Sequence, residues 1–368
     1  MKKKIAFVVG SLTAGGAERV ISTLSNELIE RYEVSIIQLV KEKPFYNLNS
    51  KIKIFSCREE KKISSNSIES ITNNYYFYKK ISSYLKEEKI DIVIGFITST
   101  NILSILASRK AKIPCIISER NNPEIENAPK KKWNFLRNVL YKKANYLVVQ
   151  TEQIKSFFDK LLEPNNVVIL ANPLSQEITE KSLQKNTKEN IVLNIGRLTE
   201  QKAQHLLINA FSNIDNNDWK LIIAGEGKLR DKYQKMIDDL GMTDKISLIG
   251  KTKNVVGLYQ KSKIFVMTSK FEGFPNVLIE AMYMGLAPIS TNCPTGPSEL
   301  INSNENGYLI EIDDQKALEN KLIKLIQNEN LIQDFGSKAH IAAKPFEATK
   351  ITSEWEILIK DCLNNTSI

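Results

Sequence analysis

The chain is patterned as apolar runs, each followed by a turn and then by residues with helical spacing, and the pattern recurs in both halves. Near-continuous apolar runs predict strands that are buried on both faces. The sequence therefore predicts α/β domains in which helices cover both faces of a parallel sheet. The predicted strands lie at residues 4–11, 33–40, 51–56, 91–96, 114–118, 146–150 and 167–170, and then at 190–198, 219–225, 245–250, 264–268, 287–291 and 306–310.

The length of 368 residues exceeds what one hydrophobic core usually serves, so two domains are expected. A polar tract at residues 175–189 has no apolar periodicity and is the predicted hinge. The first domain is expected to cover residues 1–172 and the second residues 173–349, with a helix at 350–368 packing back on the first. Another polar segment, residues 58–74, is predicted to be a loop.

The stretch from Ile264 to Gly285 predicts a ligand site. A buried strand leads through a Gly-Phe-Pro turn into a helix that Gly285 ends. Two carboxylates bracket this unit, Glu272 in the turn and Glu280 about one turn inside the helix. Free N–H groups at a helix start suit an anion, and carboxylates accept from hydroxyls, so the stretch favours an anionic or sugar ligand.

Two cations flank the loop after the first predicted strand of the second domain. Arg197 and Lys202 stand where the carboxyl ends of α/β strands bind ligands. Fixed cations at this edge can hold a diphosphate and stabilise it as it leaves, in place of a divalent metal. Either residue alone is better explained as a surface charge on a loop. The loop that contains Thr252, after a later strand, is positioned to meet a base edge.

Gly15 and Gly16 lie between the first predicted strand and the first predicted helix. Glycines there let the backbone approach a ligand at a helix N-terminus. The segment is neither a G-x-G-x-x-G dinucleotide fingerprint nor a phosphate-binding loop, which requires Gly-Lys-Ser/Thr. A flexible loop with no ligand is the alternative.

The net charge of +9 comes from the first half of the chain. Residues 1–172 contain 28 Lys and Arg and 17 Asp and Glu, whereas the remainder contains 23 Lys and Arg and 25 Asp and Glu. This asymmetry suggests an acidic partner such as anionic lipid, a phosphorylated acceptor or nucleic acid, or else a solvated basic surface. The segment Lys130–Lys143 concentrates the charge around an apolar stripe of Trp133, Leu136 and Leu140. It predicts either a helix that contacts an anionic membrane or a domain helix with solvated lysines.

Other classes of protein find little support. No run of about 20 apolar residues predicts a transmembrane helix, and the N-terminus fits a first strand better than a signal peptide. Four cysteines lie far apart and only two histidines occur, so neither a metal site nor a disulfide framework is indicated, and a reducing cytoplasm fits. No RNA-binding or helix-turn-helix motif occurs, so no nucleic-acid partner is expected.

Three motifs together resemble the family 4 retaining glycosyltransferases of the GT-B fold. They are Gly-Gly-Ala-Glu-Arg at 15–19, Gly-Arg-Leu at 196–198 with Lys202, and Glu272-Gly-Phe-Pro-Asn-Val-Leu-Ile-Glu280. The resemblance covers nearly the whole chain and implies two Rossmann-like domains that face each other across a cleft. The segments 96–101 and 117–123 are similar to bacterial enzymes that extend undecaprenyl-diphosphate-linked glycans, among them N-acetylgalactosaminyltransferases.

This resemblance implies that the second domain binds a nucleotide-sugar donor and the first the acceptor. Arg197 and Lys202 would grip the donor diphosphate, Glu280 the ribose, and Glu272 the sugar near its reacting carbon. The further donor-binding residues that it implies are Gly15, Gly16, Arg120, Thr252, Phe274, Asn276 and Val277. The reaction would retain anomeric configuration by front-face substitution, so the two carboxylates are not the acid and nucleophile of a retaining hydrolase.

The first domain departs from the pattern of many relatives at Arg120, where they carry a histidine. Arg120 either takes over the contact with the donor or leaves it unmade. A guanidinium cannot act as a general base at neutral pH, so base catalysis from this position is not expected.

The resemblance leads to a retaining hexosyltransferase that moves a sugar from UDP-GalNAc, UDP-Gal or UDP-GlcNAc to a polyprenyl-diphosphate-linked glycan, without a cofactor or metal. It would work in the cytoplasm, peripheral to the inner face of the plasma membrane. The alternatives are a GDP-mannose-dependent mannosyltransferase, a GT-B nucleotide-sugar epimerase or phosphorylase, and a non-catalytic sugar- or nucleic-acid-binding module.

Overall fold

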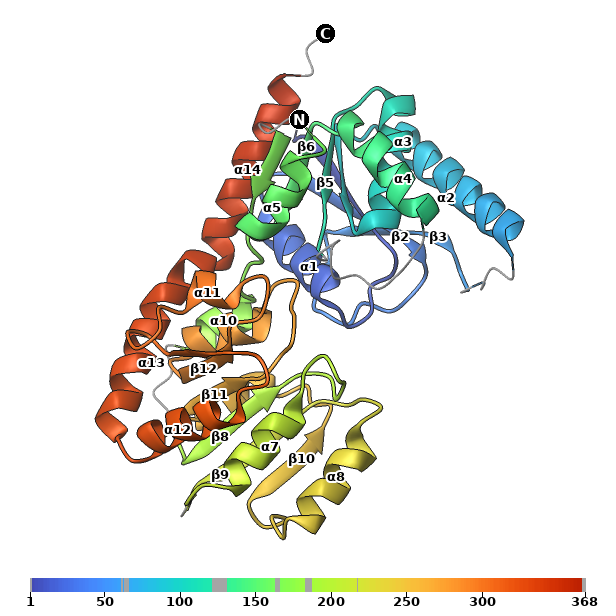
Figure 1. Cartoon of the computed structure of the whole chain (residues 1–368). Coiled ribbons are helices and arrows are strands. Elements are labelled where there is room, and N and C mark those ends of the chain that lie inside the picture. The colour runs from blue at the N-terminus through green and yellow to red at the C-terminus, as the bar shows by residue number, and fades with distance from the viewer. Residues whose placement is uncertain are drawn as a thin grey trace. The chain divides into compact units, whose positions relative to one another are not determined.

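In a computed structural model of the chain, the described residues are 2–60, 62, 66–120, 131–162, 166–182, 187–216 and 218–365. The chain forms two compact units, Met1–Pro173 with Ala348–Ile368, and Leu174–Glu347. Each contains one parallel sheet with helices on both faces (Figure 1). The predicted doubly wound α/β class is thereby confirmed.

The sheet of the first unit has seven strands in the order β3-β2-β1-β4-β5-β6-β7. Every neighbouring pair is parallel. The strands are β1 (Lys4–Val9), β2 (Glu33–Val40), β3 (Lys53–Arg58), β4 (Ile92–Phe96), β5 (Cys115–Ser118), β6 (Tyr146–Val149) and β7 (Val167–Ile169). The helices are α1 (Gly16–Leu28), α2 (Ser67–Glu87), α3 (Thr98–Ala111), α4 (Lys131–Leu140), the 3-10 turn η1 (Tyr141–Lys143), α5 (Glu152–Asp159) and α14 (Ala348–Asn364).

Alternate side chains of the central strand β1 enter two different cores. Ile5 and Phe7 belong to the core beneath α1 and α14, whereas Ala6 and Val8 belong to the core beneath α2 and α3. This is the two-residue period of a strand that is buried on both faces. The C-terminal helix α14 completes the first core, because Trp355 is fully buried and its ring stacks on Phe96 with centroids 5.9 Å apart.

Helix α2 corrects the prediction that residues 58–74 form a loop. It begins at Ser67, where the side chain of Asn66 caps it by accepting from the Glu69 N–H at 2.9 Å. The first turns look loop-like in sequence because their apolar residues do not enter the core. Ile68 and Ile71 are 75% and 67% exposed.

The sheet of the second unit has six strands in the order β10-β9-β8-β11-β12-β13, and all its pairs are parallel. The strands are β8 (Ile191–Ile195), β9 (Lys220–Ala224), β10 (Ile246–Gly250), β11 (Ile264–Met267), β12 (Ala287–Thr291) and β13 (Tyr308–Ile310). The helices are α6 (Gln176–Ser182), α7 (Gln204–Ser212), α8 (Arg230–Asp239), α9 (Val255–Lys261), α10 (Asn276–Tyr283), α11 (Pro297–Leu300), α12 (Gln315–Ile326), α13 (Glu329–Ala343) and the 3-10 turn η3 (Lys344–Phe346). Two cores again cover the two faces of the sheet.

The polar tract at 175–189 also contains more structure than its composition predicts. Residues Gln176–Ser182 form α6, which the almost fully buried Ile178 anchors to the core beneath α9 and α10. One apolar residue in seven gives no visible period, so the helix is not evident from sequence. Among the described residues, no helix is both long and apolar enough to cross a membrane.

Candidate active site

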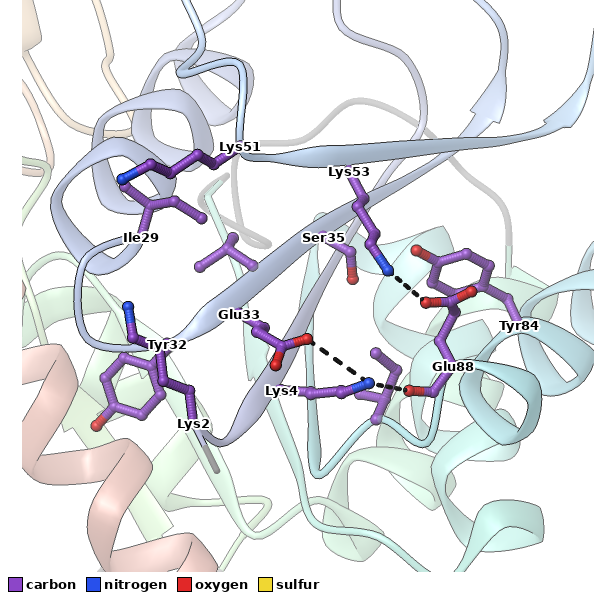
Figure 2. A pocket seen from close by; sticks show the side chains of 12 residues that line it. Lys2, Lys4, Ile29, Tyr32, Glu33, Ser35, Lys51, Lys53, Tyr84 and Glu88 are labelled. Atoms are coloured by element: carbon purple, nitrogen blue, oxygen red, sulfur yellow. Dashed lines mark hydrogen bonds and ion pairs between the residues drawn. The ribbon is translucent and has the colours of Figure 1, made fainter.

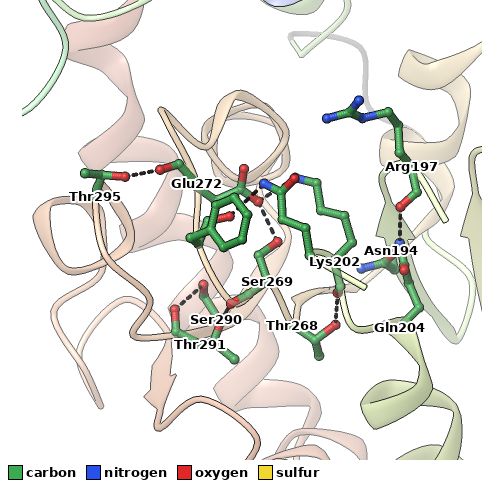
Figure 3. Close-up of polar contacts among 12 residues, drawn as sticks. Asn194, Arg197, Lys202, Gln204, Thr268, Ser269, Glu272, Ser290, Thr291 and Thr295 are labelled. Atoms are coloured by element: carbon green, nitrogen blue, oxygen red, sulfur yellow. Dashed lines mark hydrogen bonds and ion pairs between the residues drawn. The ribbon is translucent and has the colours of Figure 1, made fainter. Parts of the chain in front are cut away.

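The carboxyl ends of three adjacent strands, β8, β11 and β12, gather the main polar cluster of the second unit. Lys202 follows β8, and its ammonium lies 2.5 Å from the Glu272 carboxylate in the loop after β11. Ser269 donates to the same carboxylate oxygen at 2.5 Å. Figure 3 shows the three side chains converging. Glu272 and Lys202, 70 residues apart in the chain, are thus brought together as neighbours.

Backbone contacts hold this pair in place. Thr268 donates to the Lys202 carbonyl at 2.8 Å, and Gln201 donates to the Phe271 carbonyl at 2.9 Å. Thr295, from the loop after β12, donates to the Glu272 carbonyl. Because the side chains of Lys202 and Glu272 are only 16% and 8% exposed, their charges act in a medium that screens them less than water does.

Gly296 allows two of these loops to approach each other. Its φ of +106° is one that side-chain-bearing residues rarely adopt, and an added Cβ would lie 2.4 Å from Pro275 Cδ. Any larger residue there would push the loop after β12 away from the start of α10. The Pro-Thr-Gly-Pro segment predicts a rigid, glycine-containing turn, but Gly296 was not among the predicted site residues.

Arg197 lies on the same loop as Lys202, but its side chain does not join the pair. It is exposed, and Figure 3 shows its guanidinium apart from Lys202 and Glu272, with no interaction drawn to either. Its backbone carbonyl accepts from Gln204 at 3.0 Å, which fixes the loop. Within the described residues, the Arg197 guanidinium makes no ion pair, so it is available to an anion from solvent.

Glu280 faces inward from α10 and is 3% exposed. The hydroxyl of Tyr259, a fully buried residue of α9, donates to its carboxylate at 2.9 Å. This hydrogen bond orients the carboxylate and makes Tyr259 a site residue that the sequence analysis missed. No signal in the sequence pairs two residues on separate helices.

Some of the backbone N–H groups that were predicted to face a ligand at the start of α10 form hydrogen bonds within the turn instead. The Asn276 N–H donates to the Phe274 carbonyl at 2.9 Å, and the N–H groups of Leu278 and Ile279 donate to the Pro275 carbonyl. Val277 follows Asn276 in the first turn of the helix. Thr252 lies after β10, where its hydroxyl accepts from the Asn254 N–H at 3.0 Å.

In the first unit, Gly15 and Gly16 stand at the start of α1, as predicted. Gly15 is extended, and a Cβ on it would lie 2.2 Å from the Glu18 carboxylate, which folds back over the helix start. Burial raises the pKa of Glu18, against a smaller lowering by a backbone hydrogen bond. A carboxylate, not anticipated from the sequence, therefore lies beside this helix N-terminus.

Arg120 follows β5 and is buried against aromatic rings. Its guanidinium lies 4.8 Å from the centroid of Phe96 and 5.9 Å from that of Trp355, and it donates to the side chain of Asn172. Desolvation lowers its pKa to about 9, so it remains a cation at neutral pH. Within the described part of the chain, its Nε and Nη2 have no hydrogen-bond partner. Buried donors of this kind favour a ligand that accepts from them.

Glu119, the residue before Arg120, belongs to a second buried network. Thr98 and Tyr141 donate to one of its oxygens at 2.9 and 2.7 Å, and the Tyr141 hydroxyl accepts from Asn101 at 3.0 Å. Burial, followed by the charge and hydrogen bond of Glu119, raises the pKa of Tyr141 well above its usual value. The network fixes the end of β5 and therefore the place at which Arg120 leaves the sheet.

The predicted membrane helix is described only in part. Lys130 and residues 121–123 lie outside the described residues, as do the side chains of Lys131, Lys132 and Trp133. Arg137, predicted to flank the apolar stripe, is instead 6% exposed, with its guanidinium near the rings of Phe157 and Phe158. No cluster of three or more His, Cys, Asp or Glu that could hold a metal ion occurs among the described residues.

The two halves of the chain match two glycosyltransferase families. Residues 14–177 match glycosyltransferase family 4, and residues 175–341 match glycosyl transferases group 1. Together with the two parallel-sheet units and their polar strand ends, these matches define a glycosyltransferase of the GT-B fold. The resemblance predicted from the sequence is confirmed, and the chain belongs to the glycosyltransferases of family 4 and group 1.

Two relatives match over almost their full length. A Campylobacter jejuni protein named GalNAc-alpha-(1->4)-GalNAc-alpha-(1->3)-diNAcBac-PP-undecaprenol alpha-1,4-N-acetyl-D-galactosaminyltransferase is 35% identical over 98% of this chain and 99% of its own. The amylovoran biosynthesis glycosyltransferase AmsD of Erwinia amylovora is 26% identical over 98% of this chain and 100% of its own.

Solved structures share the fold. Anabaena HepE in complex with UDP has a TM-score of 0.77 at 17% identity and covers 98% of this chain and 100% of its own. The lipopolysaccharide outer core galactosyltransferase WaaB has a TM-score of 0.74 at 20% identity, over 97% of this chain and 99% of its own.

Proposed function

We propose that the protein is a retaining glycosyltransferase that moves an N-acetylhexosamine or hexose from a UDP-sugar to a polyprenyl-diphosphate-linked glycan in cell-surface glycan synthesis. The observation that carries the proposal is the pair of Lys202 and Glu272 at the carboxyl edge of a parallel sheet, in a chain 35% identical to a transferase whose name includes an undecaprenol-linked glycan. The name of that relative favours UDP-GalNAc as the donor.

Lys202 would stabilise the leaving diphosphate. Negative charge develops on the diphosphate as the bond to the sugar breaks, and an already oriented ammonium stabilises that charge without reorganising. Arg197 is exposed on the same loop and supplies a second cation that must turn toward the ligand. The two cations would perform the neutralisation that divalent metals provide elsewhere.

The carboxylates would bind hydroxyls. Glu280, which Tyr259 orients, accepts from the ribose, and Glu272 accepts from the sugar near its reacting carbon. Since Lys202 and Ser269 both donate to Glu272, its carboxylate is held as an acceptor. In front-face substitution the leaving diphosphate takes the proton of the acceptor hydroxyl, so neither carboxylate needs to act as a nucleophile.

The remaining predicted donor contacts stay proposals. The backbone around Phe274 and Val277 and the hydroxyl of Thr252 would contribute from the second unit. Gly15, Gly16 and Arg120 would contribute from the first unit. Because the Asn276 N–H already donates to the Phe274 carbonyl within the turn, Asn276 would contribute through its side chain.

The first unit would provide the contact with the membrane. On α4, Phe135 is 68% exposed and Val139 43%, and on α2 the exposed Ile68, Ile71 and Tyr75 recur at helical spacing. Both helices contact α3, and Figure 1 shows all three along one side of this unit. Exposed apolar groups beside lysines suit an anionic membrane surface, which would place the enzyme on the inner face of the plasma membrane.

A nucleotide-sugar panel tests this proposal. UDP-GalNAc, UDP-GlcNAc, UDP-Gal and GDP-mannose are screened for a raised unfolding temperature, since a ligand that binds only the folded state stabilises it. The stabilising donor is then supplied with a polyprenyl-diphosphate glycan, with and without EDTA. We expect a UDP-sugar to stabilise the protein and transfer to continue in EDTA. Stabilisation by GDP-mannose alone, or loss of transfer that Mn²⁺ or Mg²⁺ restores, would contradict the proposal.

A further inference from the structure

A cavity of about 170 Å³ lies in the first unit, at the amino ends of β1, β2 and β3 (Figure 2). The C-terminal end of α2 borders it, through Tyr84 and the C-cap residue Glu88. In open α/β sheets the ligands of the main reaction bind at the carboxyl ends of the strands. This cavity is at the opposite edge, so the proposed transferase site does not account for it.

The register of the strands explains why the cavity is polar. Lys4 pairs with Glu33, and Ser35 pairs with Lys53. Because side chains two residues apart share a face, these four residues point to the same side of the sheet as Ala6, which belongs to the core under α2. At the amino ends of the strands, charged and hydroxyl groups therefore line a face of the sheet that becomes apolar further along the strands.

Ammonium groups outnumber carboxylates in the lining. Lys2, Lys4, Lys51 and Lys53 line the cavity, against Glu33 and Glu88, and Lys51 is also paired at 2.8 Å with Glu30, which lies outside the lining. Two more observations favour an anion. The ion pair of Lys4 with Glu33 is long, at 3.6 Å, and the side chain of Lys53, which pairs with Glu88 at 2.8 Å, is 63% exposed. Exposed ion pairs of this kind contribute little to stability, so the lysines can turn to a stronger anion at small cost.

Hydroxyl and apolar groups complete the cavity. Tyr84 is 8% exposed, and burial raises its pKa, so its hydroxyl stays protonated and able to donate. Ile29, Val34 and Ile90 form the apolar part of the cavity wall. The volume is below the roughly 300–1,000 Å³ of sites for drug-sized ligands, which restricts the occupant to a small molecule.

We propose that this cavity binds a small phosphorylated anion, either inorganic phosphate or a short phosphate monoester, whose phosphate group Lys4 and Lys53 hold. A phosphate carries close to two negative charges at neutral pH, which the ammonium groups of Lys4 and Lys53 would offset once they turn from Glu33 and Glu88. Lys4 also donates to the backbone carbonyl of Glu88 at 3.0 Å. Occupation of the cavity is thereby linked to the C-terminal end of α2 and provides a site at which a phosphorylated metabolite can act on this helix.

Calorimetric titration of the full-length chain tests the proposal. The background carries Arg197→Ala and Lys202→Ala, so that the two proposed donor-site cations of the second unit cannot hold phosphate. Inorganic phosphate and glycerol phosphate are titrated separately, at ionic strength held constant with chloride. We expect saturable binding of at least one of them with a stoichiometry near one. Tighter binding of the ester identifies a phosphorylated metabolite as the source, and tighter binding of the inorganic ion identifies free phosphate.

Variants at the cavity should change the affinity for phosphate in opposite directions. Lys4→Met with Lys53→Met should weaken binding at least tenfold, whereas Glu88→Gln, which removes the competing carboxylate, should tighten it. Lys41→Met is the matched control, because Lys41 forms an exposed ion pair with Glu59 in the same unit and lies outside the cavity. Absence of saturable binding, or equal affinity in all these variants, would overturn the proposal. Because the background lacks both donor-site cations, failure here leaves the transferase proposal intact.

Discussion

The carboxyl edges of the two sheets hold their cations in different ways. In the second unit, Lys202 is paired with Glu272, and contacts among the loops after β8, β11 and β12 hold this pair. In the first unit, Arg120 is buried against Phe96 and Trp355. Two of its nitrogens lack a partner among the described residues. The first arrangement orients a charge before a ligand arrives, and the second keeps desolvated donors for the ligand to satisfy.

The comparison predicts that Lys202 contributes mainly to the transition state. Lys202→Ala should lower kcat by about 10²–10³-fold, or about 2.7–4 kcal/mol, as removal of a preorganised charge-stabilising donor does elsewhere. Steady-state kinetics with the preferred donor measure the effect. Lys270→Ala is the matched control, because Lys270 is a nearby lysine whose ammonium pairs with Asp313 at the surface. Turnover near that of the wild type would remove Lys202 from the mechanism.

Replacing Arg120 should lower activity with little effect on stability. Arg120→Met keeps contacts with the aromatic rings and removes a desolvated cation, so we expect unfolding free energy within about 1 kcal/mol of wild type. We expect kcat/KM to fall by about 10–100-fold, the worth of a hydrogen bond to a charged group. Arg137→Met is the control, since Arg137 is also a buried cation near two rings. If both variants lose activity equally, Arg120 has no special contact with substrate.

Lys188, in the second unit, makes the free energy of unfolding depend on pH. It donates to the carbonyls of Met284 and Gly285 at the end of α10, and burial lowers its pKa to about 8. Between pH 8 and about 10.5 the unfolded chain binds more protons than the folded one, so this lysine makes stability rise with pH.

Chemical denaturation across that range tests the effect of Lys188. Lys188→Met should lower the pH slope by at most about 1.4 kcal/mol per pH unit. Lys338→Met, at an exposed i,i+4 ion pair, should leave the slope as in the wild type. An unchanged slope in Lys188→Met would show that the amine is not desolvated in solution.

The smallest expected effect concerns the orientation of Glu280. Tyr259→Phe removes a hydroxyl that donates to the Glu280 carboxylate at 2.9 Å and lies 3.3 Å from the Val277 carbonyl. A hydrogen bond of this kind is worth about 0.5–1.5 kcal/mol, and we expect KM for the donor to rise about 2–10-fold with kcat little changed. Tyr233→Phe is the control, because Tyr233 is also a fully buried tyrosine of this unit but belongs to the core beneath the other face of its sheet. A lowered kcat with unchanged KM would place Glu280 in the chemical step instead.

Much of the fold follows from the sequence because parallel strands buried on both faces are read directly from continuous apolar runs. The proximity of Lys202 and Glu272 was also predictable, since both follow strand ends that meet at one edge. By contrast, the first turns of α2 expose Ile68 and Ile71, so apolar spacing there does not mark a core.

The supporting contacts were not predictable for a different reason. Tyr259 reaches Glu280 from another helix, and Trp355 reaches Arg120 from the far end of the chain. Arg137 sits in a basic segment but is buried, because its guanidinium packs near Phe157 and Phe158. Such pairings depend on tertiary packing, which local composition and periodicity do not encode.

The anomeric configuration of the transferred sugar tests the central claim most directly. The product formed from an α-linked UDP-sugar and a polyprenyl-diphosphate glycan is examined by proton NMR of the new linkage. The account predicts an α linkage, with the Lys202→Ala variant forming the same product more slowly. A β linkage would contradict retention, and release of free sugar or an epimerised donor without transfer would contradict the proposed reaction itself.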